Sequence, residues 1–281
     1  MSMGQASGRQ RIEQPALREA PGDTLVSFVL HELRGRLRGV IMWGVAVGLY
    51  VGVMVIAYPS LEGELDLGMY PEAFRNAFGI ADMSTLGGFL GAQFFNYIGP
   101  LVLSFFPILV LSAVIAGAEE RGTIDVLLGK PLPRWQLVAG SFVTVAISLL
   151  GILAILTLFT WLAATLADVD LSFGAVLEGA LSLWPISLFF GSLALLCSAI
   201  FRQRILAIAV PAAVLFGMYL LDVIGGLAED AEALQSLSAF YYYSSGITEG
   251  VDWASFSGLV VAALVLSVLA VLAFRRRDIY T

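Results

Sequence analysis

Two long stretches without a charged side chain dominate the sequence. No Asp, Glu, Lys or Arg occurs from Met83 to Ala118, and none occurs from Trp135 to Ala167. A helix needs about 20 apolar residues to cross the hydrocarbon core of a membrane, so each stretch is long enough for one crossing. Of the 281 residues, 59% are hydrophobic and only 13% are charged, about half the charged share of a soluble domain. The sequence therefore predicts an all-α protein that crosses a membrane several times.

Six apolar stretches are predicted to cross, with the N- and C-termini on the cytoplasmic side. The predicted spans are residues 39–59, 95–117, 136–166, 179–201, 205–222 and 253–274. Lys and Arg concentrate in the loops and tails that stay in the cytoplasm. In this arrangement every Lys and Arg except Arg75 falls on the inner side, and most acidic residues fall on the outer side. The charge distribution thus supports the topology and a place in the cytoplasmic membrane.

The segments before the first span are predicted to stay on the inner side. Residues 1–22 are polar and are expected to form a flexible cytoplasmic tail. Residues 23–38 are expected to form an amphipathic helix that lies in the headgroup layer, because Val26, Leu30 and Leu37 share one face. An ordinary basic run beside the first span is the alternative. The remainder, 39–281, forms the transmembrane domain, with outer loops at 60–94 and 223–252.

Two features of the spans predict how they pack. Gly44, Gly48 and Gly52 recur every four residues, a spacing that lets another helix approach closely. Packing within one protomer is favoured over a dimer interface. Pro100 and Pro107 are expected to kink the second span or to free backbone carbonyls, and the glycine-rich stretch before it is expected to lie along the outer surface.

Several kinds of chemistry are excluded by the residues that the sequence lacks. One histidine cannot form an HExxH zinc site, and one cysteine, Cys197, cannot form a disulfide within the chain. No phosphate-binding P-loop is present, since Pro131 follows the only Gly-Lys pair. Glu119 and Glu120 resemble the start of an intramembrane-protease motif, but Ile124 stands where that motif needs arginine. The chain is therefore predicted not to be an enzyme, and its basic residues are too scattered for nucleic-acid binding.

The charged segment 118–134 interrupts the apolar sequence between the second and third spans. Ile124, Leu127 and Leu128 would share one face of a helix over Glu119–Leu128, which Gly129 would end. The spans contain almost no ionisable residue that would bind a driving ion. If the protein transports, its energy is therefore expected to come from a partner that binds this inner segment. A solvated loop with a half-buried helix is the alternative for 118–134.

The same segment resembles the signature of the type-2 permeases of ATP-binding-cassette (ABC) transporters, of the prokaryotic exporter type. The string AGAEERGTIDVLLGKPLPR contains the matching positions, which are Glu119, Glu120, Gly122, Thr123, Leu127, Leu128, Pro131 and Arg134. The ending FRRRDI after the last span, the six-span length and the large first outer loop are also similar to the family.

The resemblance implies a permease subunit that works with two cytoplasmic ABC ATPase subunits and a second permease, either a copy or a paralogue. The partner ATPases would bind ATP and Mg, and this chain would hold no cofactor. Segment 118–134 would be the coupling helix, with its apolar face, which includes Ile124, in a groove of the ATPase and with Glu119, Glu120 and Arg121 setting its angle. Export of a small molecule, drug, lipid or ion is the expected activity.

The transport pathway is expected between protomers, with the second and fifth spans as its walls. Six residues are candidates for its lining: Asn96, Phe105, Phe106, Phe216, Tyr219 and Asp222. For each of them, packing against lipid or against the protein core is the alternative. Two other functions also remain open, namely a membrane immunity or assembly factor that does not transport, and a gradient-driven carrier.

Overall fold

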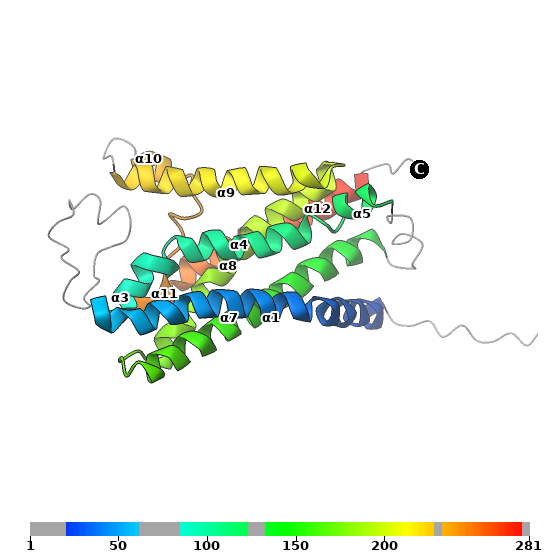
Figure 1. Cartoon of the computed structure of the whole chain (residues 1–281). Helices are drawn as coiled ribbons and strands as arrows, with labels where there is room; N and C mark the ends of the chain where they lie inside the picture. The colour runs from blue at the N-terminus through cyan, green and yellow to red at the C-terminus, as the bar shows by residue number, and fades with distance from the viewer. Residues whose placement is uncertain (1–20, 62–84, 123–132, 228–231, 277–281) are drawn as a thin grey trace, which may run out of the picture.

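The computed structural model describes residues 21–61, 85–122, 133–227 and 232–276 and consists there of helices, turns and short connections. Five helices are long and apolar enough to cross a membrane, and a bent pair of shorter helices makes six if it forms one crossing. The all-helical membrane fold is therefore confirmed. The helices run along one common direction, so that their ends gather at two opposite ends of the molecule (Figure 1).

The first span and the predicted amphipathic helix are one continuous helix, α1 (Pro21–Leu61). Neither Gly35 nor Gly39 interrupts it, because a single glycine in a helix costs only about 1 kcal/mol. Val26, Leu30 and Leu37 are exposed along its first turns and leave an apolar face for lipid. Its position in the headgroup layer remains a prediction.

The glycine stripe of α1 packs within the protomer, as expected. It faces α7 (Arg134–Leu166), the third span. A Cβ atom on Gly44 would lie 2.8 Å from Ile155 Cβ, and one on Gly48 would lie 2.9 Å from Phe159 Cβ. Only glycine permits this approach of the two helices, so the stripe is occupied by a contact inside the chain.

The second span is bent, and its first part is not the surface loop that the sequence suggested. It consists of α3 (Leu86–Leu90), a π-helical turn (Gly91–Phe95) and α4 (Ile98–Leu111), with a bend of 44° between the turn and α4. Residues 86–94 of the predicted outer loop 60–94 are helical, and the large apolar side chains of this part are buried in the core. Residues 62–84 of that loop lie outside the described residues.

Pro100 explains the bend. A proline has no amide hydrogen and its ring clashes with the carbonyl four residues earlier, here that of Asn96, where the helix breaks. The nearby Phe95 carbonyl accepts a hydrogen bond of 2.7 Å from the Tyr243 hydroxyl. Burial raises the pKa of Tyr243, which keeps this phenol protonated as a donor. Pro107, by contrast, lies within α4 and does not break it.

Three more helices complete the membrane domain. They are α8 (Phe173–Ile200), α9 (Arg204–Leu227) and α12 (Trp253–Arg276), with the short α10 (Glu232–Gln235) and α11 (Gly246–Glu249) between the last two. α8 is the central helix. Of the residues in its apolar 18-residue stretch, 72% are buried, against 28% for the corresponding stretch of α9. It contacts α4, α7, α9 and α12, so the core of the domain is built around it.

The two ends of the molecule differ in charge. The start of α1, the short α5 (Ala116–Glu120), the α8–α9 turn and the end of α12 gather at one end (Figure 1). All described arginines lie at this basic end, at positions 34, 36, 38, 121, 134, 202, 204, 275 and 276. Asp168, Asp170 and Glu178 lie at the opposite end, between α7 and the first turns of α8. This separation agrees with the predicted topology, in which the basic end faces the cytoplasm.

Candidate coupling site and transport pathway

The segment 118–134 leaves the membrane domain at the basic end. Its first residues belong to α5, which ends at Glu120, and its last residue, Arg134, begins α7. The predicted unbroken helix over Glu119–Leu128 is wrong at Gly122, which has φ = 64° and donates its amide to the Glu119 carbonyl. A glycine in the left-handed conformation ends a helix. The helix therefore ends seven residues before Gly129, where the sequence predicted its end.

The other predicted coupling residues are placed only in part. Glu119 is half-buried, whereas Glu120 and Arg121 are exposed and accessible to a partner. Thr123, Ile124, Leu127, Leu128 and Pro131 lie outside the described residues, so their part in coupling stays a prediction.

A break separates α4 from α5, although no proline lies within it. In a continuous helix the Ala116 amide would donate to the Ser112 carbonyl. Instead, the Ala116 amide donates to Ser198 Oγ (3.0 Å), and the same hydroxyl donates to the Ser112 carbonyl (3.1 Å). The Ile115 amide also donates to this oxygen (3.2 Å). The Ser198 hydroxyl of α8 is thus inserted into the hydrogen-bond ladder, one of the known causes of helix kinks.

Arg204, the first residue of α9, binds the exposed end of α4. Its Nη2 donates to the Leu109 carbonyl at 3.3 Å, which also accepts a hydrogen bond from Ser112 Oγ at 3.1 Å. A cation at a helix C-terminus is favoured by the unpaired carbonyls and by the helix dipole. The Arg204 Nε atom is buried and has no hydrogen-bond partner among the described residues. Arg204 is therefore half-buried beside the break.

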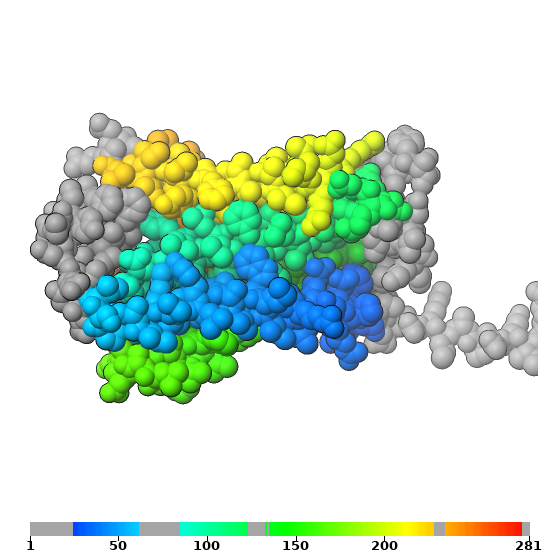
Figure 2. Space-filling model, in the orientation of Figure 1, coloured from blue at the N-terminus to red at the C-terminus, as the bar shows by residue number. Residues whose placement is uncertain are grey.

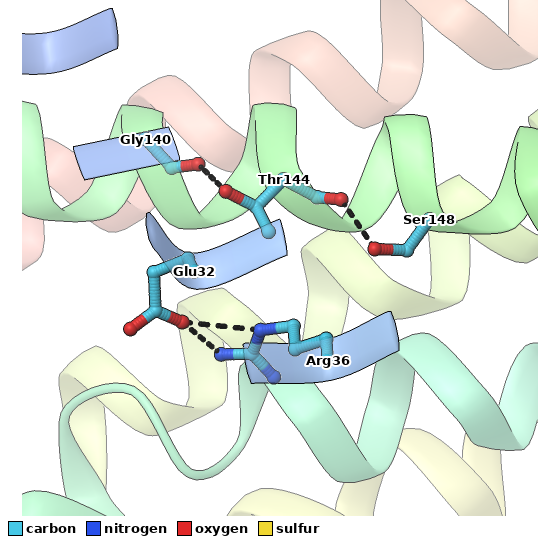
Figure 3. Close-up of polar contacts among 5 residues, drawn as sticks. All are labelled: Glu32, Arg36, Gly140, Thr144 and Ser148. Carbon is cyan, nitrogen blue, oxygen red and sulfur yellow. Dashed lines mark hydrogen bonds and ion pairs between the residues drawn. The ribbon is translucent and has the colours of Figure 1, made fainter. Parts of the chain in front are cut away.

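A crevice of about 160 Å³ lies between the start of α1, the α4–α5 break and the start of α7. Glu32 and Arg36 of α1 border it and form an ion pair of 2.7 Å (Figure 3). Arg121 borders the crevice from the other side. On α7, Thr144 Oγ1 donates to the Gly140 carbonyl (Figure 3). Phe28 of α1 packs against Gly140 so closely that a Cβ atom there would lie 2.6 Å from its ring. The first turns of α1 are thus fixed against the base of the coupling segment.

Four of the six candidate pathway residues gather where α4 faces α9. The Phe105 and Phe216 ring centroids are 6.1 Å apart, and Phe216 is 47% exposed. Tyr219 packs against Tyr97 (5.4 Å), close to Asp222 one turn further along α9. On this side of the molecule α4 is visible between α1 and α9 (Figure 2), so the strip between them is open to a partner or to cargo.

The other two candidates lie elsewhere. Phe106 is buried on the side of α4 that faces α1, where it contacts the Trp43 ring at 6.1 Å. It thus packs in the core, which was the alternative to a place in the pathway. Asn96 is half-buried in the bend between the π-helical turn and α4.

Asp222 is buried although the sequence suggested that it marks the outer end of the fifth span. Its carboxylate accepts a hydrogen bond of 3.2 Å from the Tyr97 hydroxyl, and its backbone carbonyl accepts one from Gln235 Nε2 at 3.0 Å. Because the side chain turns inward, α9 continues past it for another turn, to Leu227.

An apolar cavity of about 540 Å³ lies between α8, α9, α12 and the connection before α11. None of the described residues that line it is charged, and the α12 side is built from small residues such as Ala254, Gly258 and Ala262. Phe189 and Met218 close the opposite side. The apolar side chains among these residues suit an uncharged, apolar molecule.

Sequence reasoning did not single out Ser198, and it assigned Arg204 only to a short inner turn. In the sequence, Ser198 is a serine within an apolar run and Arg204 is an arginine at the edge of a span, and neither pattern indicates a partner. Their partners on α4 and α5 are 82 to 95 residues away along the chain, so only the fold brings them together.

The described residues contain no group of three or more His, Cys, Asp or Glu side chains that could hold a metal ion. A search of curated proteins finds no sequence that matches this chain. A family model described as ABC-2 family transporter protein, however, matches residues 27–279, which is almost the whole chain and includes all six spans and segment 118–134. The chain therefore belongs to the ABC-2 family of transporter proteins.

Proposed function

We propose that this chain is the permease subunit of an ABC exporter, in which two ATPase subunits act on segment 118–134. The family supplies the membrane component of ABC transporters. The observation that carries the coupling role is the position of this segment. It leaves the basic end of the membrane domain between α5 and α7, and both of its described ends join helices that pack on α8.

ATP binding would close the two ATPases and move the coupling segments of both permeases. Exposed Glu120 and Arg121 at the end of α5 would meet the ATPase, and the Ile124, Leu127 and Leu128 face would enter its groove. A second permease, either a copy of this chain or a paralogue, would pair with the strip between α1 and α9.

The Leu127→Asp exchange combined with Glu120→Lys is expected to uncouple ATP hydrolysis from transport. The introduced aspartate would place a charge in an apolar groove, which costs a few kcal/mol, and the introduced lysine would repel a basic partner side chain. The assay measures ATP hydrolysis and cargo efflux together, in vesicles that contain the permease and the ATPase that co-purifies with it.

Val126→Asp is the matched control, because Val126 lies off the Leu127 face of the predicted helix. Normal coupling in the Leu127→Asp, Glu120→Lys variant would contradict the docking role. Efflux that persists without ATP and follows a proton or sodium gradient would instead identify a gradient-driven carrier.

The apolar cavity supports an uncharged, lipophilic cargo. A Cβ atom on Gly258 would meet no atom within 4 Å, so a larger residue fits there without a clash and fills the cavity. Gly258→Leu is therefore expected to lower labelling by a photoactivatable, uncharged diacylglycerol analogue in segment 237–262, measured by mass spectrometry of the purified protein in nanodiscs.

Gly217→Leu is the matched control, because Gly217 is equally open but does not border the cavity. Equal labelling of this segment in both variants and in the wild type would contradict the assignment of the cavity to cargo.

A further inference from the structure

We propose that Ser198 and Arg204 are positioning residues that transmit the displacement of the coupling segment to α9. This inference rests on the proposed function, because it describes how a push on segment 118–134 enters the membrane domain. The two residues flank the α8–α9 turn, and each binds the second span at its break between α4 and α5.

The direct route from the coupling segment into α4 is weak. At the break, the amides of Ile115 and Ala116 donate to Ser198 and not to carbonyls of their own helix. The amides of Ala113 and Val114, which follow α4, donate to the carbonyls three residues earlier, at 3.2 and 3.3 Å, as in a 3₁₀-helix. α5 is therefore joined to α4 by a turn that lacks the regular helical hydrogen bonds, and the amides at the start of α5 donate to Ser198 of α8.

The fully buried Ser198 holds three backbone groups of the second span with one hydroxyl. Around it, Ala116 of α5 packs in one apolar cluster with Cys197 of α8 and Ala207 of α9. This cluster contains one residue from each of the three helices, so α5 cannot shift without moving against both α8 and α9.

Arg204 connects α9 to both sides of the break. Its guanidinium donates to Leu109 of α4, and its side chain lies against α5, where a Cβ on Gly117 would be 3.2 Å from Arg204 Cδ. Because Gly117 has no side chain, the arginine stem fits between α5 and α4. A displacement of α5 therefore acts on the first residue of α9.

α9 is the element that such a push would move. Only 28% of its apolar 18-residue stretch is buried, against 72% for that of α8, so fewer packing contacts hold α9 in place than hold α8. At its far end it carries Tyr219 and Asp222, which face α4 along the proposed pathway. A rocking motion of α9 about its Arg204 end would open or close that strip.

The native Cys197 allows a test that needs no ATPase. It is buried in the cluster beside Ser198, and the described residues contain no other cysteine. In the full-length protein in nanodiscs, Ser198→Ala is expected to raise the rate of Cys197 alkylation by N-ethylmaleimide about tenfold, because the loss of buried hydrogen bonds lets α5 leave the cluster. Arg204→Ala is expected to act in the same direction, and Arg204→Lys, which retains the charge, to act less.

The controls are Ser187→Ala and Arg202→Ala. Ser187 is buried in the same helix, but its hydroxyl has no hydrogen-bond partner among the described residues, and Arg202 is exposed in the same turn. Alkylation rates in the Ser198 and Arg204 variants that equal those of these controls would overturn the proposal.

A second measurement tests transmission itself in the complex with the co-purifying ATPase. Spin labels at Ile224→Cys on α9 and Leu162→Cys on α7, both exposed positions, are introduced in a Cys197→Ala background. ATP with vanadate is expected to change the distance between the labels, and Ser198→Ala with Arg204→Ala is expected to abolish this change. In separate samples without vanadate, the same double variant is expected to continue to hydrolyse ATP. Ser187→Ala with Arg202→Ala should leave it intact.

The outcomes separate this inference from the proposed function. If the Leu127→Asp variant uncouples the complex but the Ser198 and Arg204 variants still move α9, the proposed function stands and the transmission route is wrong. If the Leu127→Asp variant behaves as the wild type, the proposed function fails, and the claim of transmission fails with it, whereas the alkylation rates still test the contact.

Discussion

Replacing Gly191 by alanine is expected to lower the melting temperature of the protein by about 5–10 °C. Gly191 lies on α8 where α4 crosses it, and a Cβ atom there would be 2.5 Å from Pro107 Cβ and 3.3 Å from Leu111 Cδ1. A proline ring inside a helix cannot rotate away, so the two helices must separate. Overpacking of this kind costs about 1–3 kcal/mol, and more where the neighbour is rigid.

The matched control is Gly217→Ala on α9, where an added Cβ would meet no atom within 4 Å. This exchange should leave the melting temperature unchanged or raise it slightly, since alanine is the better helix former. Both temperatures are measured by the intrinsic tryptophan fluorescence of the purified protein in nanodiscs. Equal melting temperatures for the two variants would show that α4 and α8 are not in this close contact.

The Gly191 contact also bears on the coupling route. Pro107 and Gly191 join α4 to α8 on the membrane side of the break, and Ser198 joins α5 to α8 at the break itself. α4 and α8 therefore pack closely against each other, and the turn at 112–115 joins this pair to α5 along the chain. Gly191→Ala should thus affect stability, whereas Ser198→Ala should affect the movement of α9.

Several helix boundaries were predictable, because long apolar runs without charge or proline have one plausible assignment. The third span was predicted at 136–166 and is observed as Arg134–Leu166. The sixth was predicted at 253–274 and extends to Arg276. The arginines that follow the last span fix its end, since charged side chains remain near water.

Boundaries were misplaced where a charged residue was taken as the end of a span. The fourth span begins at Phe173, six residues before the prediction, because Ser172 caps the helix by accepting a hydrogen bond from the Ala175 amide at 3.1 Å. Glu178, which the prediction placed outside the span, lies within the second turn of that helix. The fifth span extends past Asp222 because Tyr97 donates to its carboxylate. Ser172 and Tyr97 are uncharged, so the positions of charged residues did not indicate their roles.

The candidate site was predictable only as a segment. Glu120 and Arg121 are exposed at the basic end, as expected from their charge, but the end of α5 at Gly122 depends on a backbone conformation that the helical pattern of 119–128 did not indicate. The contact of Ser198 with the second span joins residues 83 positions apart at Ile115, and no local periodicity predicts such a pair.

The glycine-rich start of the second span gives the second large prediction: Phe94→Ala is expected to destabilise the protein by about 3–5 kcal/mol. The sequence indicated that this glycine-rich part lies along the outer surface, where the exchange would cost little. In the structure Phe94 is 1% exposed and packs against Tyr50 of α1 (6.0 Å) and against Phe95 (5.2 Å). Lipid cannot refill the resulting void, so these packing contacts would be lost.

Phe173→Ala is the matched control, because it removes the same side chain from a site that is 48% exposed at the start of α8. Denaturation of both variants in nanodiscs, followed by tryptophan fluorescence, compares the two losses directly. The surface-loop interpretation predicts equal and small losses, whereas the bent span predicts a much larger loss for Phe94. A large loss would also show that α3 and the π-helical turn hold α1 against the core.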